Sequence, residues 1–171
     1  MSLKPVVSII MGSTSDLPVM QKCIDIFEQM EVPYEVHALS AHRTPSEVEG
    51  FARNAASRGI RVIIAAAGMA AHLPGVIAAM TTLPVIGVPI KSTLEGMDAL
   101  LAIVQMPPGV PVATVGINAA MNAGLLAVQI LATSDEDLAE KFSSYKEGLK
   151  QKIVSANQDL SRLEGLNFKT N

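Results

Sequence analysis

The stretch Arg61-Val62-Ile63-Ile64-Ala65-Ala66 decides the fold class of this chain, because every residue after Arg61 is apolar. Strands of a parallel sheet are buried on both faces, so they read as continuous apolar runs and not as alternating ones. We therefore interpret this stretch as a central strand of a parallel sheet. Such a sheet needs helices on both of its faces, which predicts an α/β architecture.

Strand-like and helix-like segments alternate on both sides of this run. We expect five strands, at 6–11, 32–39, 61–66, 84–88 and 112–116. Helices are expected between and after them, at 16–30, 45–57, 70–80, after Ser92 and at 119–132. Five such units predict a flavodoxin-like fold, with a doubly wound five-stranded parallel sheet in a three-layer sandwich.

Two of these helices have start signals in the sequence. Thr44-Pro45-Ser46-Glu47 supplies a capping hydroxyl, a proline at the first helical position and a glutamate at the third. Gly59 is expected to end that helix. Ser92 and Glu95 form a similar pair before the next helix, and we expect them to cap it.

The C-terminal part of the chain differs from the rest. Ser134-Asp135-Glu136-Asp137 opens a long amphipathic helix whose other faces are heavily charged. Its apolar side carries Leu138, Phe142, Tyr145, Leu149 and Ile153. So narrow a stripe fits packing on the chain's own domain or on a neighbouring subunit. We expect a catalytic domain at 1–133 and a helical extension at 134–171.

Composition bounds the class of protein. Of the 171 residues, 49% are hydrophobic and only 17% are charged, against about 25% charged in typical domains. An excess of apolar residues favours a homo-oligomer. The net charge of −3 and the lack of a basic cluster argue against a nucleic-acid partner. Two long uncharged stretches are interrupted by glycine and proline, so we expect no membrane partner.

Cysteine content and the N-terminus indicate the compartment. The single cysteine, Cys23, lies on an apolar helical stripe and is expected to be a buried small hydrophobe. One thiol forms no disulfide within the chain. The N-terminal apolar run ends in a polar turn and not in a cleavage site, so we expect a cytoplasmic protein.

Three loops are expected at one edge of the sheet. Segments 12–16, 40–43 and 67–75 each follow a predicted strand. In an open parallel sheet, ligands bind outside the carboxyl ends of the strands, near the point where strand order reverses. Side chains from these three loops should therefore converge on one ligand.

The first two loops carry residues suited to a phosphorylated ligand. Ser13 and Ser15 offer hydroxyls beside the free amides of a helix N-terminus, which favours phosphate. Asp16 would repel phosphate but can accept hydrogen bonds from a ribose diol; an ordinary helix cap is the alternative for this segment. Arg43 can clamp phosphate or form a surface salt bridge. His42, beside it, is a candidate acid/base.

The third loop reads Gly68-Met69-Ala70-Ala71-His72-Leu73-Pro74-Gly75. Its small residues predict a smooth backbone wall for a flat ring or a carboxylate, and His72 either binds substrate or holds the loop. His37, inside the second strand, is interpreted as structural. No His, Cys, Asp or Glu spacing resembles a metal site, and the elbow of a serine hydrolase is missing.

The chain closely resembles the bacterial-type, class I 5-(carboxyamino)imidazole ribonucleotide mutases of purine biosynthesis, within the phosphoribosylaminoimidazole carboxylase catalytic subunit family. The resemblance spans about 6–132, and the SAHRTP and AAHLPG segments are its most specific part. The matching segments are Met11-Gly12-Ser13-Thr14-Ser15-Asp16, Ser40-Ala41-His42-Arg43-Thr44-Pro45, Ala70-Ala71-His72-Leu73-Pro74-Gly75, Gly87-Val88-Pro89, Val104-Gln105-Met106-Pro107 and Asn122-Ala123-Gly124-Leu125-Leu126.

The resemblance implies an isomerase that uses His42 as acid/base, without cofactor or metal. It implies a homo-octamer with interlocking C-terminal helices. The implied substrate-binding residues are Ser13, Ser15, Asp16, Ser40, Arg43, Gly68, Ala70, His72 and Leu73. Two departures stand out: Met69 replaces the family's usual glycine, and the loop 117–121 is shorter and lacks the usual lysine.

Two other functions remain as alternatives. One is the related carboxylase that adds carbon dioxide directly to aminoimidazole ribonucleotide; that branch typically has lysine in place of Arg43, so the sequence favours the mutase. The other is a non-catalytic module that binds flavin or a nucleotide. Flavin sites usually stack the ring on aromatic residues, and none lies on a predicted ligand loop.

Overall fold

The computed structural model describes residues 4–165, and the chain divides into two compact units after Leu131. The first unit alternates strands and helices as expected. Its strands are β1 (Val7–Met11), β2 (Tyr34–Ala38), β3 (Val62–Gly68), β4 (Val85–Ile90) and β5 (Ala113–Thr114). Its helices are α1 (Leu17–Met30), α2 (Pro45–Asn54), α3 (Leu73–Ala78), α4 (Met97–Val104) and α5 (Ala120–Ala132), with 3-10 turns η1 (Thr14–Asp16) and η2 (Ala56–Arg58).

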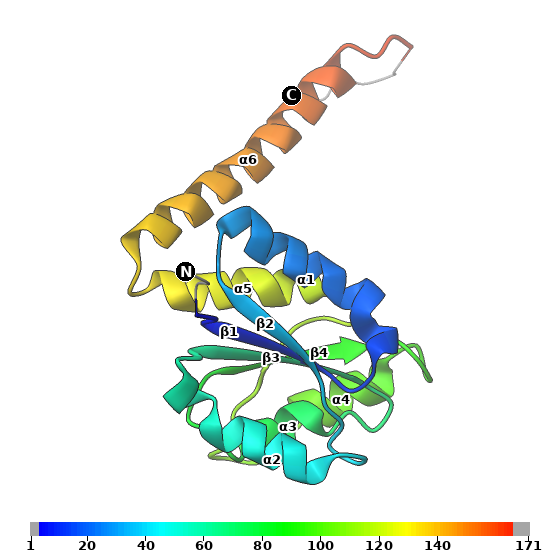
Figure 1. The fold of residues 1–171 in the computed structure, drawn as a ribbon. Helices are drawn as coiled ribbons and strands as arrows, with labels where there is room; N and C mark the ends of the chain where they lie inside the picture. The colour runs from blue at the N-terminus through cyan, green and yellow to red at the C-terminus, as the bar shows by residue number, and fades with distance from the viewer. Residues whose placement is uncertain (1–3, 166–171) are drawn as a thin grey trace. The chain divides into compact units, whose positions relative to one another are not determined.

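The five strands form one parallel sheet in the order β2-β1-β3-β4-β5. Helices α1 and α5 cover one face, while α2, α3 and α4 cover the other (Figure 1). The fold is therefore the doubly wound three-layer α/β fold that the sequence predicts. The strand order reverses between β1 and β3, and in folds of this kind the ligand site lies beyond the carboxyl ends at that point.

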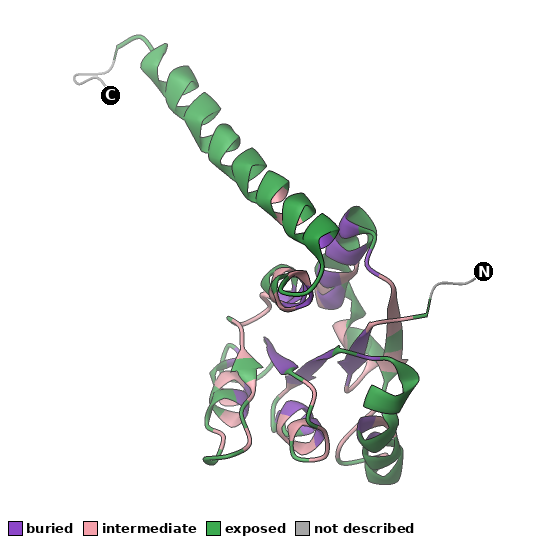
Figure 2. Cartoon of the chain, turned by 90° about the vertical axis from the view of Figure 1, so that its left-hand side faces the viewer, coloured by how far each residue is buried: buried purple, intermediate pink, exposed green. Residues whose placement is uncertain are grey.

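The central strands are buried on both faces, as Figure 2 shows for the sheet. On one face Ile10 and Ile63 belong to a buried cluster with Val48 and Ile103. On the other face α1 and α5 approach closely, since a Cβ atom on Gly124 would lie 3.2 Å from the Cys23 carbonyl oxygen. Cys23 is fully buried as a free thiol, which confirms that it is a buried small hydrophobe, and this burial raises its pKa to about 12.

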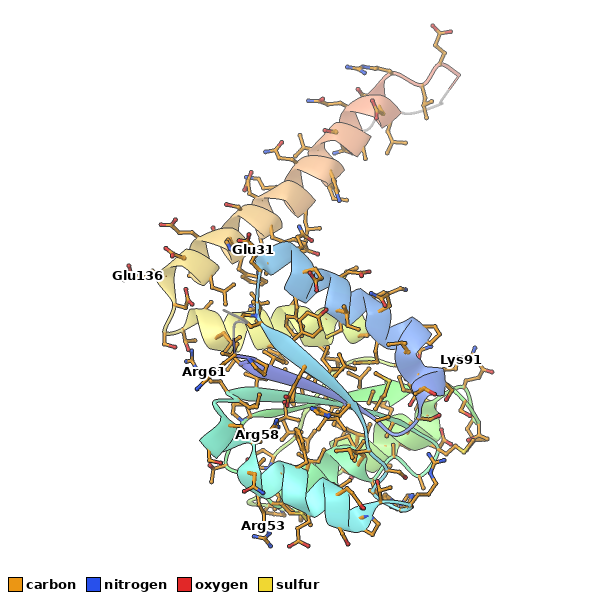
Figure 3. The ribbon with its side chains drawn as sticks, in the orientation of Figure 1. Glu31, Arg53, Arg58, Arg61, Lys91 and Glu136 are labelled. Carbon is orange, nitrogen blue, oxygen red and sulfur yellow. The ribbon has the colours of Figure 1, made fainter. Side chains whose placement is uncertain are left out.

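A polar network fixes the edge strand β2. The Ser8 hydroxyl donates to Glu35 over 2.6 Å, and Arg58 of η2 donates to both carboxylate oxygens over 2.7 and 3.0 Å. Figure 3 labels Arg58 below the sheet. Burial alone would raise the pKa of Glu35, but Arg58 and Ser8 lower it below its ordinary value. The His37 ring packs against Phe51, with 5.5 Å between the two ring centroids.

Pro45 is the first residue of α2 and Glu47 lies in its first turn, as predicted, but neither predicted side-chain cap forms. Thr44 precedes α2, but its hydroxyl bonds to the backbone of Ser40 and makes no cap bond. Helix α4 begins at Met97, after three residues with positive φ, Leu94, Glu95 and Gly96. The polar groups near its start pair locally instead, because the Thr93 hydroxyl donates to the Asp98 carboxylate.

The bounds of several elements also differ from the prediction. Helix α2 ends at Asn54 and a 3-10 turn leads to Gly59, which adopts φ 99° and closes the segment. Helix α3 covers only Leu73–Ala78, because the preceding residues form a tight loop. Strand β5 covers two residues.

The second unit contains one long helix, α6 (Glu136–Ser161). The Asp135 side chain caps it by accepting from the Leu138 amide over 3.0 Å. Leu138 is buried, whereas Leu149 and Ile153 are exposed, and Figure 2 shows most of α6 as exposed. Over the part of the chain that the structure describes, no helix has the length and apolar character needed to cross a membrane.

Candidate active site

The loop after β1 presents hydroxyls and one carboxylate. The Ser13 hydroxyl accepts from the Ser15 amide over 3.2 Å and from the Ser15 hydroxyl over 2.9 Å. Asp16 occupies the position before α1 but makes no cap bond. Partial burial raises its pKa, against the opposing effect of hydrogen bonds from Ser15 and the Ser13 backbone. A carboxylate that is neither capping nor paired with a cation is available for a neutral hydroxyl ligand.

The loop after β2 is folded around Ser40. The Ser40 hydroxyl accepts from the Arg43 amide over 3.2 Å and from Arg43 Nε over 3.3 Å. The Thr44 hydroxyl accepts from the Ser40 amide and donates to the Ser40 carbonyl. These bonds make a compact turn, so His42 and Arg43 project from a fixed backbone.

Arg43 connects the first two loops. Its Nη2 atom donates to the Gly12 carbonyl oxygen over 2.6 Å. Arg43 therefore contacts the Ser40 hydroxyl of one loop and the Gly12 carbonyl of the other at the same time. The remaining N–H groups of its fork suit a phosphate oxygen. The role of the Gly12 carbonyl has no signal in the sequence, because any residue offers one.

His42 connects the second loop to the third. Its Nε2 atom lies 2.9 Å from Nδ1 of His72, and the two rings are nearly perpendicular. His72 stands at the residue before α3, on the loop after β3. Both imidazoles are exposed, so a ligand at this edge of the sheet meets them from solvent.

The third loop is tight and largely backbone. Gly68 is the last residue of β3, and a Cβ atom there would lie 3.2 Å from the Ile90 carbonyl oxygen. Two short hydrogen bonds follow, from Ala71 to the Met69 carbonyl over 2.9 Å and from His72 to the Ala70 carbonyl over 2.8 Å. Leu73 is buried as a whole residue, so it offers little surface to a ligand at this edge.

A fourth segment reaches the same edge after β4. Figure 3 labels Lys91 there, and its amide donates to the Asn118 side chain over 2.9 Å. Asn118 has a positive φ, and its own amide donates to the Pro89 carbonyl. The short loop 117–121 therefore ties the ends of β4 and β5 together through Asn118. An asparagine in a turn is the only sequence signal for this contact.

Comparison with known proteins places this site in a family. The family model described as AIR carboxylase matches residues 6–152. An N5-carboxyaminoimidazole ribonucleotide mutase of Pyrococcus abyssi is 59% identical over 148 residues, which cover 86% of this chain and 85% of that protein. A protein of the same name from Bacillus subtilis is 56% identical and is covered over 99% of its length.

Two further similarities extend the comparison. A phosphoribosylaminoimidazole carboxylase of Schizosaccharomyces pombe is 54% identical over 96% of this chain, which spans 30% of that longer protein. A crystal structure of Treponema denticola PurE has a TM-score of 0.85 and is 29% identical, with coverage of 92% of this chain and 99% of that one. By its sequence and its fold, this chain belongs to the AIR carboxylase family.

Proposed function

We propose that this protein is an N5-carboxyaminoimidazole ribonucleotide mutase, an isomerase of purine biosynthesis. It converts 5-(carboxyamino)imidazole ribonucleotide to 4-carboxy-5-aminoimidazole ribonucleotide. Relatives that are 51–59% identical over most of this chain have that name. The observation that carries the assignment is the 2.9 Å contact of His42 with His72, because it sets an exposed imidazole between a polar loop and a backbone wall.

In this proposal the polar loops bind the ribose phosphate. Ser13, Ser15, Ser40 and Arg43 hold the phosphate group; Arg43 contacts the Ser40 hydroxyl and the Gly12 carbonyl next to Ser13, which supports this assignment. Asp16 accepts hydrogen bonds from the ribose diol. Its raised pKa reflects partial burial without a cationic partner, which suits a neutral ligand better than a charged one.

The third loop receives the ring and its carboxyl group. Gly68, Ala70, His72 and Leu73 form the wall of this part of the site in the proposal. A wall of small residues allows the ring to lie against amide groups without steric conflict. No cofactor or metal takes part in the proposed reaction.

His42 moves one proton in each direction. As protonated imidazole it donates to the exocyclic nitrogen while the carbamate C–N bond breaks and carbon dioxide leaves. The neighbouring ring carbon then attacks carbon dioxide, and neutral His42 removes the proton from that carbon. One proton is given and one is taken, so the reaction needs no water and no redox partner.

His72 fixes the tautomer of His42 in this mechanism. Only one hydrogen can lie between the two facing nitrogens. If His42 Nε2 carries it and donates to His72 Nδ1, then His42 Nδ1 is the atom that alternates between acid and base. His72 is thus a positioning residue that holds the ring in one orientation during both proton transfers.

A direct assay separates the mutase from its rivals. The purified protein is given 5-(carboxyamino)imidazole ribonucleotide without ATP or added metal, and conversion is followed by absorbance. Rapid formation of the carbon-carboxylated isomer supports the proposal. Turnover only of aminoimidazole ribonucleotide with high bicarbonate would assign the direct carboxylase. A yellow protein without either activity would point to a flavin-binding module.

We also propose that the protein acts in the cytoplasm as a homo-oligomer, namely an octamer. Helix α4 exposes Met97, Leu101 and Val104 at helical spacing, and α6 exposes Leu149 and Ile153. A second copy of the chain would cover such surfaces, and we propose that α6 packs on neighbouring subunits. Sedimentation equilibrium of the full chain, beside a variant ending at residue 133, tests both points.

A further inference from the structure

Met69 is the one residue of the loop after β3 whose conformation is unfavourable for its side chain. Its φ is 56°, in the left-handed region that glycine and asparagine adopt most readily. The neighbouring residues Ala67, Gly68, Ala70 and Ala71 are all small. Met69 is therefore the one large side chain among these residues, and it lies at a backbone conformation that favours glycine.

The fold gains little from this side chain. Met69 is 56% exposed, so its thioether is not part of the core that α3 and β3 form. A residue that combines an unfavourable backbone conformation with little burial weakens the folded state. Such outliers concentrate at functional sites, where the conformation is part of the mechanism.

The position of Met69 connects it to the reacting groups. Three peptide units separate it from His72, so the two Cα atoms lie within about 11 Å even if the chain between them were extended. Two hydrogen bonds between residues two apart make the loop more compact than that. Met69 therefore lies at the edge of the same wall that carries His72, whose ring contacts His42 over 2.9 Å.

We propose that Met69 retains carbon dioxide in the site during the reaction. This inference rests on the proposed mutase function. When the carbamate C–N bond breaks, its electron pair stays on the substrate, and carbon dioxide is a free neutral molecule until the ring carbon bonds to it. In this proposal its flexible apolar thioether, which is exposed beside the wall, covers the route to solvent and offers carbon dioxide no group with which to react.

Isotope retention tests this role. Substrate labelled with ¹³C in the carbamate is converted in unlabelled bicarbonate, with carbonic anhydrase present to remove any escaped carbon dioxide. Mass spectrometry then gives the fraction of product that keeps the label, and released aminoimidazole ribonucleotide is measured beside it. Short reaction times and a blank without enzyme correct for spontaneous decarboxylation.

Three variants separate apolar bulk from backbone conformation. Met69→Leu keeps the bulk, whereas Met69→Gly and Met69→Asn remove it and suit the positive φ. Label loss per turnover should rise severalfold in the last two and stay near the wild-type value in Met69→Leu. Both bulk-removing variants should also unfold at a higher temperature, so misfolding does not explain their label loss.

The contrary results are distinct. Equal label retention in wild type and Met69→Gly would overturn the role of Met69. A fall in assembly mass on sedimentation of Met69→Gly would overturn it too, because the side chain would then belong to a subunit contact. Wild-type protein that makes no carbon-carboxylated product at all would instead refute the mutase function itself.

Discussion

The Nε2 atom of His42 lies 2.9 Å from Nδ1 of His72, although strand β1 lies between β2 and β3, the strands whose loops carry them. The contact therefore joins the loops of two strands that are not neighbours in the sheet. A second contact, from Arg43 to the Gly12 carbonyl, joins the loop after β2 to the loop after β1. Three loops are thus held together before any ligand binds.

Replacement of His72 by asparagine should reduce turnover only modestly. One neutral hydrogen bond contributes about 0.5–1.5 kcal/mol, so we expect kcat to fall about 2- to 12-fold. The pH profile of kcat should also shift, because the tautomer of His42 is no longer fixed. Steady-state kinetics from pH 6 to 9 measure both effects. A loss as large as that of a His42 variant would contradict a positioning role and make His72 catalytic.

Arg43→Lys should weaken substrate binding more than it slows turnover. Lysine keeps the charge but lacks the fork that reaches Ser40 and Gly12 together. Loss of a charge-assisted hydrogen bond of about 1.5–3 kcal/mol raises KM by about 10- to 150-fold. Arg53→Lys, at an exposed pair with Glu49 on α2, is the matched control and should leave KM unchanged. An unaltered KM in both variants would remove Arg43 from the phosphate site.

Asp16→Asn should raise stability at neutral pH while it weakens binding. Burial raises the pKa of Asp16 above its ordinary value near 3.8, so the folded state favours the protonated carboxyl. Its contribution to stability is present below pH 3.8 and is lost as the pH rises through the folded-state pKa. Thermal unfolding of wild type and variant at pH 3 and pH 7 measures this. A variant less stable than wild type at pH 7 would contradict the sign.

Gly87→Ala should destabilise the fold. A Cβ atom at Gly87 of β4 would lie 2.4 Å from Cγ2 of Ile103 on α4, so the buried Ile103 side chain or the helix would have to shift. Overpacking of this kind costs about 1–3 kcal/mol. Gly50→Ala, at an open position on α2, is the control and should stabilise by about 0.4–1 kcal/mol. Urea titrations of both variants measure the change in the free energy of unfolding. A Gly87→Ala variant as stable as wild type would show that α4 moves freely enough to accept the methyl group.

The sequence was sufficient for the fold because its strands are unambiguous. Apolar runs such as 61–66, buried on both sides, leave few alternatives to a parallel sheet, and the order of elements follows. The two helix caps could not be predicted, because a serine or threonine before a helix bonds equally well to other backbone groups. Thr44 bonds to Ser40 instead, and α4 starts after a left-handed turn that ends at Gly96.

The site was predictable as a set of loops and not as a set of contacts. Parallel strands bring their carboxyl ends to one edge, so 12–16, 40–43 and 67–75 could be expected to meet. The pairing of His42 with His72 depends on how two loops bend over the end of β1, which residue types do not encode. The positive φ of Met69 was equally hidden, since methionine rarely adopts that conformation.

The most direct test of the central claim is turnover by His42→Asn, measured together with ligand affinity. Removal of the acid/base should lower kcat by about 10²- to 10⁴-fold, while the Kd of the carbon-carboxylated product, measured by calorimetry, and the assembly mass stay close to wild type. Such a result would assign the proton transfers to His42. Turnover that remains close to the wild-type rate would contradict the mechanism and leave His42 as a binding residue.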